Sequence, residues 1–250
     1  MIVKRLLTKT IREVGRRLGL EIRRSKSVMG NMEAFLRHLR ELGFKPGHVL
    51  DVGANKTEWS RLARTLFPEA KFILVEPQAE LVQYLKAFCD ESPGSVWKLA
   101  GAGREPGEIE LIIWSDPACS SVLFQPEKDS PREIRRIPMI TIDSLFENTK
   151  DLPQLAKLDI QGFELEALAG ATKLFGQTEC FIVEVNMYKR SPTVPQFSDV
   201  VSFFNDRGYK VYDIPGDMRR PLDNALWAVD LAFVRKGGMF DRYQTLHKSN

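Results

Sequence analysis

Cysteine and histidine are scarce in this chain. The three cysteines are widely separated and form no CxxC pair (Cys89, Cys119 and Cys180). The three histidines show no metal-ligand spacing (His38, His48 and His247). These scarcities argue against a disulfide scaffold and against a thiolate zinc site, and they favour a reducing compartment such as the cytoplasm.

Long apolar runs are also absent. Runs such as residues 72–75 and 111–114 fall far short of the roughly 18 residues that cross a bilayer. Charged residues interrupt the N-terminal apolar positions, unlike a secretory signal. The composition is otherwise ordinary, with 43% hydrophobic and 28% charged residues over 250 positions. It argues against disorder and coiled coil, and it fits one large domain with short additions.

The net charge of +3 conceals an uneven distribution. Residues 1–26 contain nine basic and two acidic side chains, so the rest of the chain is mildly acidic. Such a body argues against nucleic acid as its partner. Apolar residues at helical spacing predict a basic amphipathic helix over residues 2–19. That helix could contact an anionic membrane peripherally, pack on the domain, join two subunits of a homodimer or touch nucleic acid.

Residues 27–47 are expected to hold a linker and a helix that packs on the domain. Asn31 can cap this helix and Gly43 can end it. From residue 48 the pattern changes to alternating strands and helices. Strands are expected at 48–51, 71–75, 96–100, 155–160 and 180–185, and helices at 58–67, 81–88, 164–175 and 197–204.

Two further strands, 209–214 and 227–234, are expected to pair as an antiparallel edge. Residues 103–142 interrupt the alternation with two strand-like runs, 109–114 and 137–142, around a polar loop. The repeated units predict a mostly parallel sheet with helices on both faces. The domain is expected to span residues 48–236, with a C-terminal tail over 237–250.

The loop after the first strand lies where parallel sheets bind ligands. It contains a single glycine, Gly53, so it lacks the G-x-G-x-x-G fingerprint and argues against an NAD-dependent oxidoreductase. It begins with Asp51, which can complement the positive groups of S-adenosylmethionine. Glu76 ends the next strand, where a carboxylate can accept both ribose hydroxyls. The alternative is a plain strand–turn–helix with two solvated acids.

Several segments together resemble the FkbM family of S-adenosylmethionine-dependent methyltransferases. They are DVGAN at 51–55, VEPQ at 75–78, KLDIQGFELEALAGA at 157–171, FIVEVN at 181–186 and DLAFVR at 230–235. The third is similar to the family's K-x-D-x-[EQ]-G-x-E signature with its Gly-Ala turn. The resemblance covers about residues 48–236. It implies a Rossmann-like class I methyltransferase fold with a seven-stranded sheet, S-adenosylmethionine as the cofactor, and O-methylation, often of sugars or natural products.

The cofactor-binding residues are expected to be Asp51, Gly53, Asn55, Thr57 and Glu76. Two departures from the family pattern concern this site. Thr57 stands where the family usually has glycine, although its hydroxyl can still donate a hydrogen bond. The segment 100–103 lacks the acid that many methyltransferases direct at the adenine amino group. Backbone carbonyls or Asp116 would have to take that role.

O-methylation requires a group that accepts the proton of the acceptor hydroxyl. Three carboxylates near the strand ends are the candidate catalytic residues: Asp159, Glu164 and Glu184. Glu164 could instead charge the start of its helix, and Glu184 could pair with a basic residue. Asp159, Glu184 and Asn186 could also hold a divalent cation, although no metal is assigned. The absence of an Asn-Pro-Pro-aromatic motif argues against methylation of amino groups.

Two loops and part of the insertion are candidate walls for the acceptor. They contain Met187, Tyr188, Lys189 and Arg190, then Met218, Arg219 and Arg220, and finally Ser120 and Ser121. Basic and aromatic groups suit a sugar with an acidic or phosphate substituent. The sequence therefore predicts a methyltransferase of a glycan or a related small molecule. A cofactor-binding module without catalysis, and a metal-dependent O-methyltransferase, are the alternatives.

Overall fold

A computed structural model describes residues 29–113, 133–188 and 194–242. The predicted helix over 2–19, Asp116, Ser120, Ser121, Lys189, Arg190 and most of the predicted tail lie outside these residues. In chain order, the elements are α2 (Met32–Glu41), β1 (His48–Val52), α3 (Glu58–Leu66), β2 (Lys71–Glu76), η1 (Ala79–Leu81), α4 (Val82–Glu91), β3 (Val96–Leu99), β4 (Gly101–Ala102), β5 (Gly107–Ile113), β6 (Glu133–Ile140), η3 (Ile142–Phe146), β7 (Leu155–Leu158), α5 (Glu164–Ala169), η4 (Thr172–Leu174), β8 (Cys180–Asn186), α6 (Phe197–Asp206), β9 (Tyr209–Arg219) and β10 (Leu226–Arg235).

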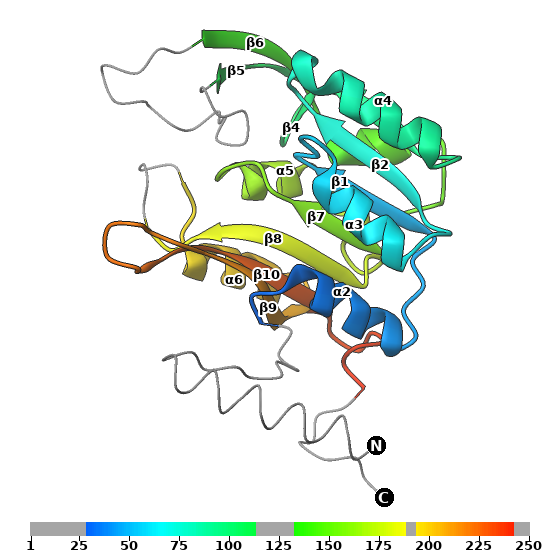
Figure 1. The fold of residues 1–250 in the computed structure, drawn as a ribbon, viewed down its shortest axis with the longest axis vertical. Helices are drawn as coiled ribbons and strands as arrows, with labels where there is room; N and C mark the ends of the chain where they lie inside the picture. Colours follow the sequence, from blue (N-terminus) through cyan, green and yellow to red (C-terminus); the bar gives the residue numbers. More distant parts are fainter. Residues whose placement is uncertain (1–28, 114–132, 189–193, 243–250) are drawn as a thin grey trace, which may run out of the picture.

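The main sheet has seven strands in the order β3-β2-β1-β7-β8-β10-β9 (Figure 1). The first five are parallel, and β10 runs antiparallel to both β8 and β9. This confirms the predicted seven-stranded, mostly parallel sheet with an antiparallel pair at one edge. The strand order reverses beside β1, between the β1–β2 and β7–β8 halves, so ligand-binding loops meet at the carboxyl ends of these strands.

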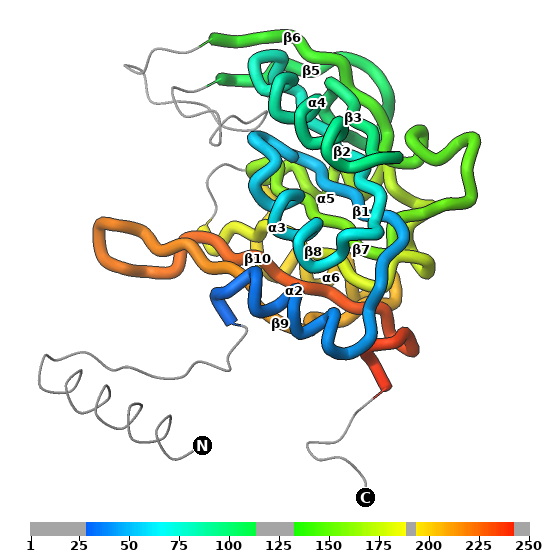
Figure 2. The backbone as a smooth tube through the Cα atoms, turned by 45° about the vertical axis from the view of Figure 1, so that its right-hand side comes forward, coloured from blue at the N-terminus to red at the C-terminus, as the bar shows by residue number. Residues whose placement is uncertain are grey.

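Helices cover both faces of this sheet, as predicted. On one face, α2, α3 and α4 bury residues such as Phe35, Leu66 and Phe88 against apolar side chains of the strands. On the other face, α5 and α6 pack residues such as Leu168 and Phe204 in a second core cluster. Figure 2 shows the sheet enclosed between these helices. Side chains that alternate along each buried strand therefore contribute to both cores.

The interruption at 103–142 is an inserted β element. The strands β4, β6 and β5 form a separate three-stranded sheet in that order. This smaller sheet begins directly after β3, because only Ala100 separates β3 from β4. The N–H of Ala100 donates to the carbonyl of Glu76 at 3.1 Å. The strand predicted at 137–142 is β6, which starts earlier, at Glu133, and also ends earlier, at Ile140. Ile142 already belongs to η3.

The predicted helix 164–175 is shorter in the structure. The helix α5 ends at Ala169, and η4 follows after Gly170. A Cβ atom on Gly170 would lie 2.2 Å from the carbonyl oxygen of Gly103, so the chain passes closely against the inserted sheet here. The strand predicted at 155–160 likewise ends at Leu158, which leaves Asp159 just beyond the end of β7.

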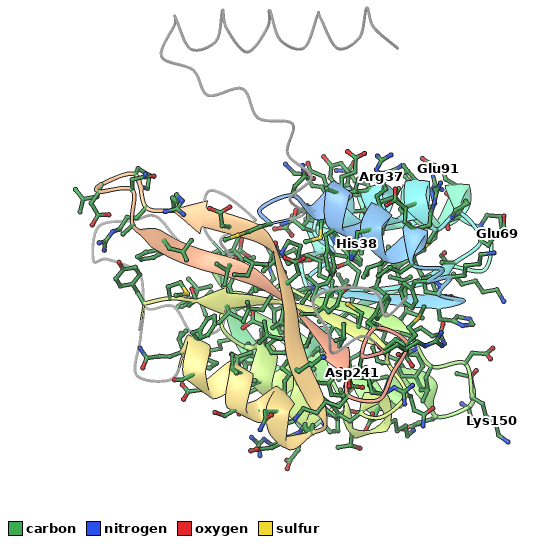
Figure 3. The ribbon with its side chains drawn as sticks, turned by 90° about the horizontal axis from the view of Figure 1, so that it is seen from below. Arg37, His38, Glu69, Glu91, Lys150 and Asp241 are labelled. Carbon is green, nitrogen blue, oxygen red and sulfur yellow. The ribbon has the colours of Figure 1, made fainter. Side chains whose placement is uncertain are left out.

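The last two strands form a hairpin, in which β9 continues to Arg219, beyond its predicted end at residue 214, while β10 lies within one residue of its predicted bounds. The tip of this hairpin projects from the body at the edge of the sheet (Figure 3). On β9, the Tyr212 hydroxyl lies 3.1 Å from His38 Nε2, which ties α2 to this edge. Among the described residues, no helix combines the length and the apolar character needed to cross a membrane.

Candidate functional site

A pocket of about 630 Å³, part of it open to solvent, lies at the carboxyl ends of β1, β2 and β7. Its floor and one wall come from the loops after these strands, including Gly53, Glu76 and Asp159. The opposite wall comes from the inserted sheet through four apolar side chains: Ile109, Leu111, Ile137 and Met139. The pocket therefore has an acidic side and an apolar side.

The loop after β1 brings its backbone close to the loop after β7. Gly53 has φ 83°, and a Cβ atom there would lie 2.0 Å from the carbonyl oxygen of Asp159. The N–H of Asp159 donates to the Val52 carbonyl at 3.0 Å. Only glycine fits this approach, because any side chain would collide with the neighbouring backbone.

Glu76 lines the pocket and is almost fully buried, with 2% of its surface exposed. Its Oε2 accepts the N–H of Asn55 at 2.9 Å, and its Oε1 accepts the N–H of Gln78 at 3.1 Å and Gln78 Nε2 at 3.2 Å. Burial raises the pKa of Glu76 against these hydrogen bonds. A carboxylate has about four acceptor positions. Among the hydrogen bonds of the described residues, one position on Oε2 therefore stays open to a hydroxyl group in the pocket.

Asn55 and Thr57 both adopt positive φ angles, 46° and 64°. Asn55 lines the pocket, whereas Thr57 is fully buried at the start of α3 and makes no side-chain cap. Thr57 Oγ1 has no hydrogen-bond partner among the described residues. The family's usual glycine at this position fits the left-handed backbone.

Asp51 does not line the pocket. It lies behind the loop, buried beside Lys157 on the neighbouring strand, and its Oδ2 accepts the Ser60 hydroxyl at 2.5 Å. Its Oδ1 is buried without a partner among the described residues. Burial raises the pKa of Asp51, and the positive charge of Lys157 opposes this rise.

Lys157 is the buried cation at the centre of several acids. Burial lowers its pKa, but the carboxylates of Asp159, Asp51 and Asp230 outweigh burial and raise the pKa above its ordinary value. Its Nζ lies 2.8 Å from Asp159 Oδ2. Lys157 and Asp230 both lie within the family-like motifs, but the motifs alone predict no role for either residue. A charged residue inside the apolar strand LWAVDLAFVR was the available signal for Asp230.

Asp159 lines the pocket, and its side chain is 33% exposed. Burial raises the pKa of Asp159, but Lys157 outweighs it and holds the pKa below the ordinary value. Asp159 is therefore an ionised carboxylate that faces the pocket at neutral pH.

Glu184 and Glu164 are more enclosed, and neither lines the pocket. Burial and the charge of Asp159 raise the pKa of Glu184 well above its ordinary value. Burial raises the pKa of Glu164 to about 7. Glu164 Oε1 accepts the N–H groups of Ile160 and Gly162 at 2.9 and 3.1 Å. The structure thus brings Asp159 and Glu184 together and assigns Glu164 to the loop backbone.

A divalent cation at Asp159, Glu184 and Asn186 would have to displace a cation that is already there, because Lys157 Nζ contacts Asp159 directly. No group of three or more His, Cys, Asp or Glu side chains is arranged to hold a metal within residues 29–113, 133–188 and 194–242.

The strand order, the antiparallel β10 and the pocket at the carboxyl edge define a Rossmann-like class I methyltransferase fold. A family model described as "Methyltransferase FkbM domain" matches residues 51–211. The chain belongs to the FkbM methyltransferase family, and it is an S-adenosyl-L-methionine-dependent methyltransferase.

Solved structures with a similar overall arrangement are distant in sequence. Precorrin-6y C5,15-methyltransferase from Geobacter metallireducens is 13% identical with a TM-score of 0.45, over 84% of this chain and 92% of that one. Streptococcus pneumoniae Sp1610 in complex with S-adenosyl-L-methionine is 12% identical with a TM-score of 0.45, over 80% and 72%. Burkholderia thailandensis 1,6-didemethyltoxoflavin-N1-methyltransferase is 12% identical with a TM-score of 0.44, over 94% and 88%. No curated protein matches the chain. The family assignment rests on the family model alone.

The residues of the pocket fit the cofactor. Gly53 lines the pocket, Glu76 keeps an open acceptor position among the described residues, and the apolar wall suits a flat base. The acidic side suits a ligand that carries positive charge without phosphate. Among the described residues, no acid of the inserted sheet lines the pocket. Asp116 lies outside the described residues, so its predicted contact with adenine stays a prediction.

Proposed function

We propose that this methyltransferase acts on a hydroxyl group of a glycan or a related small molecule, and that Asp159 accepts the proton of that hydroxyl. The observation that carries the proposal is the position of Asp159. It is the ionised carboxylate on the pocket wall, in backbone contact with the loop at Gly53. A hydroxyl acceptor needs such a group, because its proton must leave as the new O–C bond forms.

Each side chain at the acidic side then has a distinct task. When bound, the cofactor supplies a methyl group that is already activated by its sulfonium. Glu76 binds a ribose hydroxyl, Asn55 and Gly53 shape the loop beneath the ligand, and Asp51 adds negative charge behind it. Lys157 keeps Asp159 ionised and fixed in direction, which favours a productive approach of the hydroxyl.

A glycan acceptor is supported by an aromatic and basic cluster beyond the end of β8. The Tyr188 ring stacks on Trp227 with centroids 5.6 Å apart, and the Arg220 guanidinium lies 4.6 Å from the Tyr188 ring centroid. Aromatic faces and arginine are common in sites for sugars that carry acidic groups. Met187 and the exposed Met218 and Arg219 extend this surface.

Asp159→Asn tests this proposal, because it keeps the shape of the side chain and removes its ability to accept a proton. The acceptor is first sought by incubating the protein with methyl-labelled S-adenosylmethionine and a panel of glycans and small alcohols. With that acceptor, turnover should fall roughly 10²–10⁴-fold while cofactor affinity, measured by calorimetry, changes little. The exposed Asp151→Asn is the matched control. Turnover like that of the wild type would remove Asp159 from the role.

A cofactor-binding module without catalysis is the second candidate. It is favoured by Thr57, whose β-branched side chain stands in a left-handed backbone where the family has glycine. Mass spectrometry of the purified protein would detect a bound cofactor in either case. Transfer of labelled methyl to any acceptor excludes the module. Loss of transfer on addition of a chelator, with recovery on addition of magnesium, would support the metal-dependent alternative.

We also propose how the segments divide the work. The methyltransferase domain spans residues 48–236, the segment 27–47 packs on it through α2, and residues 237–250 form a tail. Residues 1–26 are proposed to contact an anionic membrane from the cytoplasmic side, which suits a lipid-linked glycan acceptor. A homodimer formed through the same residues is the rival role.

A further inference from the structure

Gln161, in the loop after β7, has a backbone conformation that is uncommon for its type. Its φ is 58°, in the left-handed region, and the next residue, Gly162, has φ 102°. Residues other than glycine, asparagine and aspartate rarely adopt this region, because the Cβ atom then lies too close to the following carbonyl oxygen. Such strain persists where surrounding contacts impose it, and it often marks a functional site. Gln161 also lines the pocket.

Glu164 imposes this conformation. Its buried Oε1 accepts the N–H groups of the two residues that flank Gln161, namely Ile160 and Gly162. Both amides therefore point toward one carboxylate oxygen. The side chain between them turns the other way, toward β8.

The side-chain amide of Gln161 joins two acids from different strands. Its Nε2 lies 3.3 Å from Asp159 Oδ1 and 3.0 Å from Glu184 Oε2. A primary amide has two N–H groups, so one hydrogen can be donated to each carboxyl. Asp159 Oδ2, on the other side, is held by Lys157 Nζ.

We propose that Gln161 is a positioning residue whose amide holds Asp159 and Glu184 as a pair that shares one proton, with Asp159 as the ionised member that faces the pocket. The inference deepens the proposed function and rests on it for the identity of the proton acceptor. It adds a reason for the strained loop and a role for Glu184 away from the pocket surface.

The charges around the pair agree with this arrangement. Lys157 on β7, Asp230 on β10 and Glu164 on α5 act on Glu184, and Lys157 contacts Asp159 directly. Asp51 on β1 repels Asp159 directly and attracts Lys157. A hydrogen bond from the Glu184 carboxyl helps to hold the pKa of Asp159 low, while the charge of Asp159 raises the pKa of Glu184. Two carboxyls this close keep one proton between them.

The pair then accounts for the proton that the reaction releases. As the acceptor oxygen bonds to the methyl carbon, its O–H bond breaks and the proton binds Asp159. The electrons of the S–CH₃ bond stay on sulfur, so the positive charge of the cofactor disappears. The pair then carries two protons beside Lys157, and one proton returns to water after the product leaves.

The test is a titration of the carboxyl groups by NMR, in protein with ¹³C-labelled Asp and Glu side chains. Asp159→Asn and Glu184→Gln assign the two signals. The main variant is Gln161→Gly, because glycine accepts the positive φ and removes only the amide. The matched control is Asn224→Gly, which removes an amide from another residue with positive φ, 61°, in the exposed turn of the β9–β10 hairpin.

In the wild type, the two signals should titrate in two coupled steps that are well separated in pH. In Gln161→Gly, the lower step should move up by about one pH unit, because a hydrogen bond to the ionised carboxylate is lost. Asn224→Gly should change neither step. If Gln161→Gly does not fold, Gln161→Glu keeps the size of the side chain, and it should raise the lower step further by adding a third acid.

Independent titration of both groups near their ordinary pKa values would overturn the inference, as would an unchanged lower step in folded Gln161→Gly. These results concern the pair and need no acceptor. They are therefore distinct from a failure of the proposed function, which Asp159→Asn would reveal through normal turnover.

Discussion

Glu76 shows how one buried side chain can serve both the fold and a ligand. Three of its acceptor positions are used by Asn55 and Gln78, which fixes the shape of the first loop. The remaining position on Oε2 is available to the cofactor ribose. The same carboxylate therefore links loop geometry to cofactor affinity.

Replacing Glu76 by alanine should weaken S-adenosylmethionine binding by about 1.5–3 kcal/mol, the range for hydrogen bonds to charged groups. Isothermal titration calorimetry measures this loss. Glu69→Ala, at an exposed position labelled in Figure 3, is the control and should leave the affinity unchanged. A folded Glu76→Ala protein with normal affinity would exclude the ribose role.

At this scale the sequence predicted which residues gather at the pocket but not how each one faces. Motif positions placed Glu76 and Asp159 at strand ends, and both line the pocket. Asp51 and Glu164 sit in equally clear motifs, yet they face Ser60 and the loop backbone instead. Side-chain direction at a strand end depends on neighbouring strands, and a motif does not record that. The motif does not predict a role for Gln161 either, because that role depends on a backbone angle.

The start of α3 is the clearest conflict between an element and its sequence. Thr57 precedes the helix in the left-handed region and is buried, and within the described part of the chain its hydroxyl has no partner and caps nothing. Both the backbone and the hydroxyl are therefore expected to cost stability. The family's usual glycine avoids both costs.

Thr57→Gly should raise the free energy of unfolding by about 1 kcal/mol, after allowing for the greater freedom of glycine in the unfolded chain. Urea denaturation measures the change. Thr57→Ser, which keeps the hydroxyl and the positive φ, should give little gain. Destabilisation of Thr57→Gly would mean that the threonine side chain makes contacts that outweigh the strain.

Most elements could be predicted because their patterns are local. Alternating apolar runs and glycines after helices located the parallel strands and α6 closely. The end of α5 could not be predicted, because helical spacing continues beyond it, whereas the helix ends at Ala169 and Gly170 passes close to the backbone of Gly103. The inserted sheet was expected as a β element, but its separation from the main sheet depends on pairing between β4 and β6, which lie far apart in the chain.

For the molecule as a whole, the described chain begins beside the β9–β10 hairpin. The N–H of Gly30 donates to the carbonyl of Ile214 on β9 at 2.8 Å. The segment 1–26, with nine basic residues, is therefore joined to the body at the edge of the sheet. A surface that binds this segment would also hold the hairpin side of the enzyme.

Full-length protein should sediment with liposomes that contain anionic lipid at low salt and return to the supernatant at high salt. Each basic residue near such a surface contributes about 1 kcal/mol, and salt screens it. A shortened chain that starts near Ser27 should remain in the supernatant and still bind the cofactor. Neutral liposomes are the control. Full-length protein that ignores anionic liposomes, or a shortened chain that unfolds, would contradict the membrane role.

The contact between Gly53 and Asp159 has a consequence for how this enzyme can diverge. Two segments more than a hundred positions apart in the sequence meet there backbone to backbone, with no space for a methyl group between them. A recombination event within the inserted sheet would take these segments from different parents. Chimeras between family members joined at that point should therefore function only when the backbone approach between the two segments is equally close in both parents. The two segments are therefore expected to be inherited as one unit.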